Sequence, residues 1–217
     1  MRRELITSAL AVVVFTIALG LIYPLVVLGI GQAAFPGNSN GSQEKVGGKL
    51  VGSRLLGQDF SRPVLDKKGK PKMDSDGNPV TEADPKYFQS RPSADSYAPD
   101  ATFFANRGPN SAAAKFFYRD GLATYLALEK PYVPGLKADG VPIDALTASA
   151  SGVDPHISQA NARIQAHRVA AVRHLPVARV EALVKDNTDG RFLGVLGEPG
   201  VNVLKLNLAV QKEASSR

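Results

Sequence analysis

The sequence predicts an α+β domain, in which helices pack on a small sheet, carried on a single N-terminal transmembrane helix. Three observations support this fold class in the 217-residue chain: a long apolar run near its start, helical spacing of apolar residues in its middle, and short strand-like runs between glycine turns near its end. We divide the chain into a cytoplasmic tail (1–4), a transmembrane helix (5–30), a connector (31–48) and an extracytoplasmic α+β domain (49–217).

The apolar run from Leu5 to Ile30 contains no charged residue. As a helix it would rise about 39 Å, more than the roughly 30 Å hydrocarbon core of a bilayer, so we expect it to tilt or to bend at Pro24. A cleaved signal peptide is the alternative, but signal h-regions run only about 7–15 residues. Arg2 and Arg3 precede the run, and the positive-inside rule therefore places the N-terminus in the cytoplasm and the domain outside.

Composition excludes several kinds of site. The chain has no cysteine, which excludes disulfides, thiolate metal sites and cysteine nucleophiles. Its net charge of +6 is mild and dispersed, and no run of basic residues alternates with aromatic ones. Together with the predicted topology, this argues against a nucleic-acid partner and leaves an acidic partner or anionic lipid open.

Residues 62–86 form a charged surface loop punctuated by prolines, which we predict to turn as a hairpin about Asp76-Gly77. The alternative is a calcium site, which would use the oxygen-bearing side chains of Asp74, Asp76, Asn78 and Glu82. An EF-hand loop needs glycine at its sixth position, whereas the glycine here falls fourth. A solvated Asp-Gly turn is therefore the better interpretation.

The first elements of the domain are predicted from short patterns. Residues 49–60, KLVGSRLLGQDF, have apolar runs interrupted by glycines, which is typical of a strand and a turn. Residues 111–129 predict a helix because four apolar residues recur at helical spacing, namely Ala114, Phe117, Leu122 and Leu126.

A second helix is predicted to begin at Asp154. Its carboxylate can accept hydrogen bonds from the free amides of a first turn, and Pro155 has no N–H to lose at the next position. Apolar residues then recur at helical spacing, at Ile157, Ala160, Ile164, Ala171 and Leu175. We expect the arginines between them to stay solvated: Arg163, Arg168 and Arg173. A third, shorter helix is predicted over 177–187.

Two strands are predicted near the C-terminus. RFLGVLG (191–197) is one of them, and VNVLKLNLAV (201–210) is the other. In the second, strict alternation would place four side chains on one face: Leu204, Leu206, Leu208 and Val210.

The stretch SASGVDPHIS (149–158) raises the question of catalysis. One interpretation is a membrane-anchored extracytoplasmic serine hydrolase that uses Ser149 or Ser151 with His156. Two features argue against it: no G-x-S-x-G elbow exposes a serine, and a histidine at a helix N-terminus meets the positive end of the helix dipole. We therefore predict no catalytic residue.

Metal and nucleotide motifs are also missing from the sequence. His167 and His174 would lie about 10.5 Å apart along a helix, too far for one zinc ion, so we predict no metal site. The sequence has no phosphate-binding G-x-x-x-x-G-K-[ST] loop. We predict no bound cofactor, and any ATP-driven chemistry would belong to another chain.

Several longer segments occur in a characteristic order: YPLVVLGIGQAAFP, VGSRLLGQDF, YFQSRPSA, LTASASGVDPHIS and GEPGVNVLKLNLAV. In this order they resemble the C subunit of the Kdp-type potassium-transporting P-type ATPases of bacteria and archaea, nearly end to end. Two stretches depart from that family. The loop 62–86 is longer than usual, and the family's SGGSNLGPSN is represented only by FFANRGPNS.

The resemblance implies a single-pass accessory subunit of a four-part inner-membrane pump. Its partners would be a channel-like A subunit that binds potassium, a B subunit that hydrolyses ATP, a small F subunit and the lipid bilayer. Potassium and ATP would then be ligands of the complex, and the family's C subunit has been described as a catalytic chaperone that raises the ATP affinity of the B subunit.

Because the predicted topology leaves only a few residues in the cytoplasm, we expect the domain to dock on the outer face of the A subunit and to influence ATP affinity indirectly. Eleven residues of the matching segments are expected to shape or contact the partner surface. They are Arg91, Pro92, Ser93, Asn110, Ser149, Ser151, Gly152, Asp154, His156, Asn202 and Asn207.

Overall fold

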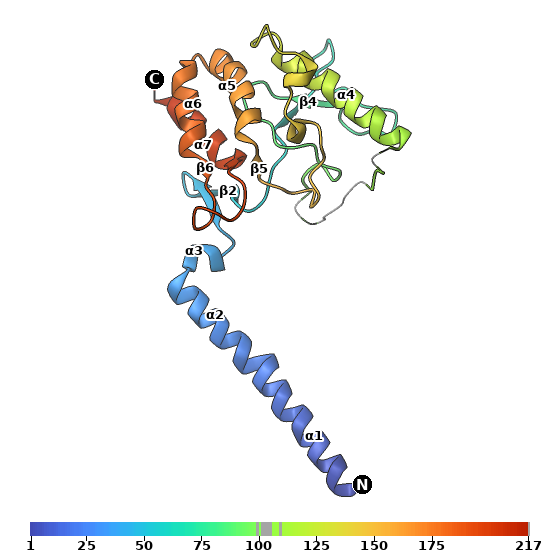
Figure 1. Cartoon of the computed structure of the whole chain (residues 1–217), viewed down its shortest axis with the longest axis vertical. Helices are drawn as coiled ribbons and strands as arrows, with labels where there is room; N and C mark the ends of the chain where they lie inside the picture. The colour runs from blue at the N-terminus through green and yellow to red at the C-terminus, as the bar shows by residue number, and fades with distance from the viewer. Residues whose placement is uncertain (99, 101–105, 109, 217) are drawn as a thin grey trace. The chain divides into compact units, whose positions relative to one another are not determined.

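The computed structural model describes residues 1–98, 100, 106–108 and 110–216, and the chain forms two compact units, Met1–Ser53 and Arg54–Arg217 (Figure 1). The architecture mixes helices with small sheets, as predicted.

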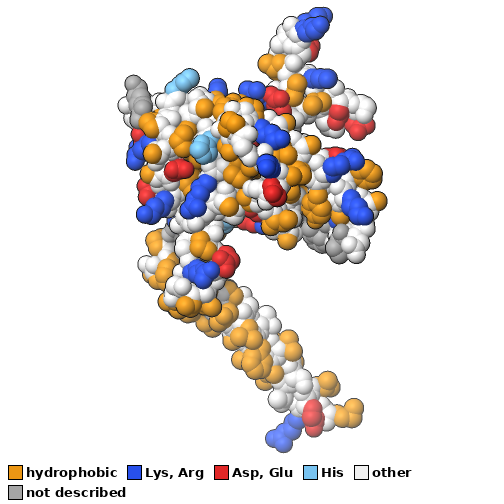
Figure 2. Space-filling model, turned by 45° about the horizontal axis from the view of Figure 1, so that its top comes forward, with side chains coloured by type: hydrophobic (Ala, Val, Ile, Leu, Met, Phe, Trp, Pro, Cys, Tyr) orange, Lys and Arg blue, Asp and Glu red, His pale blue; other side chains and the backbone are white. Residues whose placement is uncertain are grey.

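The first unit is built on one long apolar helix. It comprises α1 (Arg2–Ile17), a π-helical turn η1 (Ala18–Ile22) and α2 (Tyr23–Ala34), and together these 33 residues are long and apolar enough to cross a membrane. The π turn ends two residues before Pro24, whose missing N–H and bulky ring disturb the regular ladder at this point. Figure 2 shows apolar side chains along the helix surface.

The rest of the first unit is a short helix and a hairpin. Helix α3 (Pro36–Ser39) precedes the antiparallel strands β1 (Gln43–Val46) and β2 (Lys49–Ser53). The strand and turn predicted in 49–60 are thus confirmed at β2.

The first paired strands of the second unit belong to a ribbon, which we define as residues 61–83. Strands β3 (Ser61–Pro63) and β4 (Thr81–Ala83) pair antiparallel at its base. Between them, Leu65 bridges Pro71 and Met73 bridges Pro79. The amide of Gly77, at φ +81°, donates to the carbonyl of Asp74 at 3.3 Å, so the hairpin predicted about Asp76-Gly77 is confirmed.

The remaining elements are mostly helical. Helix α4 (Ala112–Glu129) is followed by the 3-10 turns η2 (Ala138–Gly140) and η3 (Ile143–Ala145). Then come β5 (His156–Ile157), α5 (Gln159–Arg173), α6 (Val177–Asp186), β6 (Thr188–Asp189), β7 (Gly200–Asn202) and α7 (Val203–Ser215). Strand β7 is central in an antiparallel sheet of order β5-β7-β6.

The hydrophobic core lies where α5, α6 and α7 pack with β5 and β7 (Figure 1). Its side chains are small and branched: Ala162, Ala166 and Val169 from α5, Val180 and Val184 from α6, and Val203, Leu206 and Val210 from α7. Phe88, which belongs to no helix or strand, is fully buried among them. The predicted helices α4 and α6 are confirmed within one residue, with Ser111 accepting from the Ala114 amide as the N-cap of α4.

The helix predicted to begin at Asp154 begins later. Residues His156 and Ile157 form β5, and Ser158 caps α5 by accepting a hydrogen bond from the Asn161 amide at 3.1 Å. The prediction was wrong because Ser158 offers an equally good cap after a strand that β7 can pair. Both the N-cap role of Asp154 and the helical position of Pro155 are therefore corrected.

The buried face of α5 also differs from the predicted stripe. Ala160 and Ala171 are exposed, whereas the polar residues Asn161, Gln165 and Arg168 are buried. Arg168 was expected to stay solvated and is instead fully buried, because Glu129 and backbone carbonyls satisfy its guanidinium.

The two predicted C-terminal strands are wrong in different ways. VNVLKLNLAV contributes only Val201 and Asn202 to β7 and then forms α7, capped by the Asn202 side chain on the Lys205 amide at 3.1 Å. Its apolar residues fit a helix as well as a strand, since Val203, Leu206 and Val210 fall on one helical face. RFLGVLG forms a tight exposed loop in which only Phe192 and Leu196 bridge.

Candidate functional site

The segment 85–93, PKYFQSRPS, starts in a turn at 85–87 and continues without helix or strand, and it is held by side chains rather than by strand pairing. We call it the fastened segment. Asn207 of α7 accepts from the Phe88 amide at 2.8 Å and donates to the Phe88 carbonyl at 3.0 Å. Gln165 of α5 does the same for Gln89, at 2.7 and 3.2 Å. Two buried amide side chains thus replace a neighbouring strand.

Arg168 extends this arrangement toward the start of the segment. Its Nη1 donates to the carbonyls of Pro85 and Tyr87 at 2.7 and 2.9 Å, and its Nε donates to Glu129 at 2.9 Å. Arg168 and Glu129 are both fully buried. Burial raises the pKa of Glu129, while the Arg168 guanidinium opposes the rise. The pair joins α4, α5 and the fastened segment at one point.

Arg91 connects the fastened segment to the loop that precedes β5. Its Nη1 lies 3.0 Å from Asp154 Oδ2, and its Nη2 donates to Thr147 Oγ1 at 3.3 Å. The Ser149 amide donates to the Pro92 carbonyl at 2.8 Å. The two most distinctive segments of the sequence, YFQSRPSA and TASASGVDPHIS, are therefore bound to each other.

Ser93 and Gly152 also join these two segments, and we call the contact region between 91–97 and 147–156 the junction. The Ser93 hydroxyl donates to the Gly152 carbonyl at 2.8 Å and also contacts the Asp95 carboxylate. Gly152 has a φ of +79°, and a Cβ at this position would lie 2.5 Å from Asp95 Oδ2. Glycine is therefore required at 152 by both backbone conformation and space. In the same region the Tyr97 hydroxyl donates to the Arg91 carbonyl at 2.7 Å, and burial raises the pKa of this phenol to about 12.

The two serines of the catalytic hypothesis, Ser149 and Ser151, form their side-chain hydrogen bonds within the loop 147–154. Ser149 is buried, and its hydroxyl accepts from the Asp154 amide at 3.2 Å. The Ser149 and Ser151 hydroxyls lie 3.2 Å apart, and Ser151 also accepts from the Val153 amide. In the part of the chain that the structure describes, neither hydroxyl is hydrogen bonded to a histidine. The arrangement supports a closed loop rather than a serine-histidine pair.

His156 lies between two carboxylates instead. Its Nε2 is 3.0 Å from Asp189 Oδ2, and its Nδ1 is 3.7 Å from Asp154 Oδ1. Lys205 of α7 lies 3.6 Å from Asp189 Oδ1. The contact with Asp154 is the largest cause of a raised His156 pKa; burial opposes the rise and Asp189 adds to it. Burial would raise the pKa of Asp154, but its hydrogen bonds with His156 and the Arg91 charge lower it.

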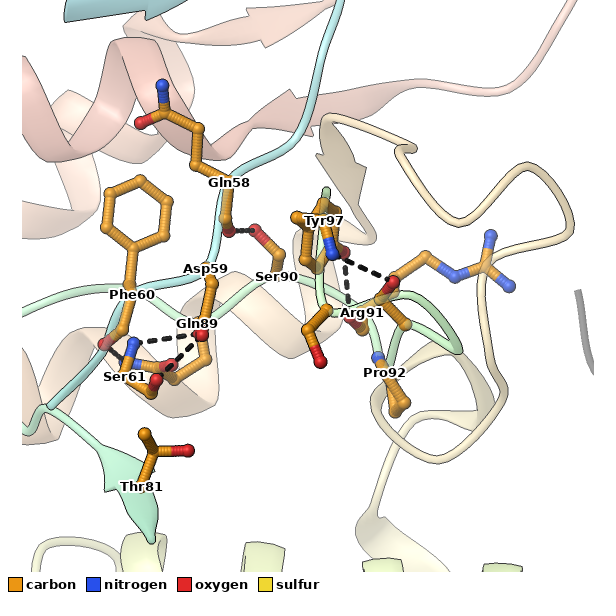
Figure 3. Close-up of a pocket in the computed structure, with 12 residues that line it drawn as sticks. Gln58, Asp59, Phe60, Ser61, Thr81, Gln89, Ser90, Arg91, Pro92 and Tyr97 are labelled. Atoms are coloured by element: carbon orange, nitrogen blue, oxygen red, sulfur yellow. Dashed lines mark hydrogen bonds between the residues drawn. The ribbon is translucent and has the colours of Figure 1, made fainter. Parts of the chain in front are cut away.

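A pocket of about 230 Å³ opens beside the fastened segment (Figure 3). It is lined by residues 58–61, Thr81, 89–93, 96 and 97, and the Ser90 hydroxyl donates to the Gln58 carbonyl at 3.0 Å. In Figure 3 the Arg91 side chain extends away from Gln89 and Ser61, toward its partners in the 147–154 loop. The pocket lining therefore mixes polar residues with the rings of Phe60 and Tyr97, and its charged residues are Asp59 and Arg91.

The other predicted site residues fall in different places. Asn202 caps α7 and donates to the Arg54 carbonyl at 2.7 Å, so it is buried and structural. Asn110 lies exposed in a turn before α4 and is not part of the junction. The prediction missed Gln165, Arg168 and Glu129, whose polar type on the inner faces of two helices is visible only once those faces are known.

The described ranges hold no group of three or more His, Cys, Asp or Glu side chains that could bind a metal ion. In the ribbon, Asp74 Oδ1 accepts from the amides of Asp76 and Asn78 at 2.9 and 2.8 Å, which is the geometry of an Asx turn.

Comparison with known proteins gives one family over nearly the whole chain. The family model of KdpC, described as "K+-transporting ATPase, c chain", matches residues 5–212. A potassium-transporting ATPase KdpC subunit from Ralstonia nicotianae is 42% identical over 210 residues, covering 95% of this chain and 90% of the relative. Subunits of the same name from Streptomyces coelicolor and Mycobacterium tuberculosis are 39% and 37% identical, over 95% and 98% of this chain and 92% and 100% of the relatives.

Proposed function

This chain belongs to the KdpC family, and on that premise we propose that it is a non-catalytic accessory subunit of an ATP-driven potassium pump. In this proposal the apolar helix anchors the chain in the plasma membrane, and the second unit lies outside the cytoplasm. There it docks on the channel-like potassium-binding subunit, in a complex with the ATP-hydrolysing subunit and a small fourth subunit.

The observation that carries this proposal is that the two most distinctive segments, YFQSRPSA and TASASGVDPHIS, are hydrogen bonded to each other. The Arg91 and Ser93 side chains and the Ser149 amide hold 91–97 against 147–154, and the Ser149 hydroxyl accepts a hydrogen bond from the Asp154 amide within the second segment. A site prepared for chemistry would instead leave a nucleophile and a base free to face a substrate. A rigid surface made by two loops is suited to binding a partner, because little conformational entropy is lost on docking.

The proposed topology limits how the chain can influence ATP. Arg2 and Arg3 before the helix favour a cytoplasmic N-terminus, which leaves the second unit on the opposite side from cytoplasmic nucleotide. Any effect on ATP affinity would then require that the domain bind one conformational state of the pump better than another. The family's chaperone role would thus be exerted through the transport subunit.

A detergent pull-down of the tagged full chain tests the assembly. We expect an ATP-hydrolysing subunit and a potassium-binding subunit to co-purify. A matched chain in which 5–30 is replaced by an unrelated apolar helix of equal length separates the anchor from the domain, and we expect it to retain both partners. Recovery of no ATPase subunit with the native chain would overturn the accessory-subunit proposal.

Single cysteines test the topology, because the chain has none of its own. We expect Lys67→Cys, exposed in the ribbon, to react in intact cells with a maleimide that cannot cross the membrane. Glu4→Cys, in the tail before the apolar run, leaves Arg2 and Arg3 in place; it serves as the matched control and should react only after permeabilisation. The reverse pattern would contradict the proposed orientation.

A further inference from the structure

The loop between β6 and β7 has apolar side chains at its tip that are exposed and do not belong to the hydrophobic core. We define the apolar loop as residues 191–197. Four of its side chains are largely exposed: Phe192 (69%), Leu193 (79%), Val195 (74%) and Leu196 (58%). A contiguous exposed cluster of large apolar side chains marks a binding or membrane-contact site.

The conformation of the apolar loop is fixed by its own backbone. Phe192 and Leu196 exchange both of their hydrogen bonds, at 2.8 and 2.9 Å. The amides of Gly194 and Val195 donate to the carbonyls of Arg191 and Phe192. Leu193 and Gly194 adopt φ values of +52° and +78°, which turns the chain tightly at the tip. The four apolar side chains are therefore presented outward by a closed turn.

A lipid surface suits this construction. Irregular backbone is normally excluded from apolar lipid because its N–H and C=O groups lose their water partners. Here most amides of the tip are already bonded within the loop. At its base Arg191 and Glu198 form an ion pair at 3.0 Å, where a charged pair can remain among lipid headgroups while the tip enters the layer below.

The second unit is covalently tethered to the apolar helix through a short connection. At the end of the apolar helix, Gln32 and Asn40 exchange side-chain hydrogen bonds at 3.1 and 3.2 Å, and the Ser53 hydroxyl donates to the Gly41 carbonyl at 2.7 Å. The chain therefore leaves the first unit close to the end of that helix. Within the second unit, Asn202, which ends the strand after the apolar loop, donates to the Arg54 carbonyl. A short tether raises the local concentration of the loop at the bilayer.

We propose that the apolar loop inserts its tip into the interfacial layer of the same bilayer that the N-terminal helix crosses. The insertion gives the domain a second attachment to the membrane, on a different element from the anchor. It requires the membrane helix but not the partner subunits, so it can fail without affecting the proposed function.

The chain contains no tryptophan, so one introduced indole reports on one position. The test uses the full chain with Phe192→Trp, reconstituted in vesicles of phosphatidylcholine and phosphatidylglycerol with or without brominated acyl chains. An indole roughly 5–10 Å below the surface should lose about half its emission to the brominated lipid. The matched control is Phe116→Trp, on an exposed apolar position of α4 (55%), which we expect to lose less than about a tenth.

A second variant tests whether the apolar tip of the loop causes the quenching. Adding Leu193→Asp to Phe192→Trp keeps the backbone conformation, since aspartate tolerates the left-handed region, but places a charge at the tip. We expect it to abolish the quenching. Equal quenching with and without Leu193→Asp, or emission of Phe192→Trp unaffected by brominated lipid, would overturn the proposal. Shielding from an aqueous quencher that appears only when partner subunits are added would also overturn it, in favour of a protein contact.

Discussion

The ribbon (61–83) and the fastened segment (85–93) are neighbours in the sequence, but their backbones are satisfied in opposite ways. The ribbon bonds to itself, through β3 and β4, two bridges and the side chains of Asp66 and Asp74. The fastened segment bonds to side chains of α5 and α7, which come from residues more than seventy positions away. A stretch without regular structure can therefore be either locally autonomous or part of the core.

The largest effect is expected from Arg168→Ala. It leaves Glu129 as an uncompensated buried carboxylate and frees the carbonyls of Pro85 and Tyr87. Removing one partner of a buried pair costs about 3–5 kcal/mol in the free energy of unfolding. Urea titration of the full chain in detergent measures this cost. Arg163→Ala, exposed on the same helix, is the control and should change stability by less than about 0.5 kcal/mol. Similar stabilities for the two variants would contradict the role of the buried pair.

A smaller loss is expected from Asn207→Ala, which leaves the buried N–H and C=O of Phe88 without their partner. Unsatisfied buried groups cost about 1–3 kcal/mol. The same titration measures it, with Gln211→Ala on the exposed face of α7 as the control. If Asn207→Ala costs no more than Gln211→Ala, the segment is held by packing alone.

The junction should also respond to pH through His156. Its folded-state pKa is raised, mainly by Asp154 and further by Asp189, so its contribution to stability is complete below the unfolded value of about 6.5 and is lost as pH rises through the folded value. Because His156 and Asp189 are partly exposed, we expect less than about 1 kcal/mol. Native chain and Asp189→Asn should differ most near pH 5.5 and least near pH 9. A difference that grows with pH would contradict this pairing.

The smallest effect is expected from shortening the ribbon. Pro63 and Thr81 are paired at its base, so residues 64–80 can be replaced by a two-residue Asn-Gly turn. The turn shortens an exposed, self-bonded excursion, and we expect a change of less than about 1 kcal/mol in the free energy of unfolding. A loss as large as that of Asn207→Ala would show that the ribbon also supports the core.

The same contrast explains how much of the fold could be predicted from sequence. Features that depend on nearby residues were predicted correctly: the helix after Ser111, the helix from Val177, and the turn at Gly77. Each rests on a cap, a periodicity or a turn residue within a few positions. They need no knowledge of distant partners.

Features set by distant partners were not predictable in this way. The start of α5 depends on β7 pairing His156 and Ile157, and the burial of Arg168 depends on Glu129 of α4. At α7 the pattern itself was ambiguous, because Val203, Leu206 and Val210 follow a helical period while the leucines at 204, 206 and 208 alternate as in a strand. The capping asparagine at Asn202 was the local indication that a helix begins there. For the candidate site, the sequence singled out the residues of YFQSRPSA and TASASGVDPHIS but did not predict that these two segments bind one another.

The most direct test of this account is the double variant Ser149→Ala with Ser151→Ala in the reconstituted pump. If these hydroxyls only close the loop before β5, the complex should still assemble, and its potassium-stimulated ATP hydrolysis and potassium transport should remain near the native level. An assembled complex with a folded domain that has lost transport would contradict the account, because the hydroxyls would then take part in the pump's work.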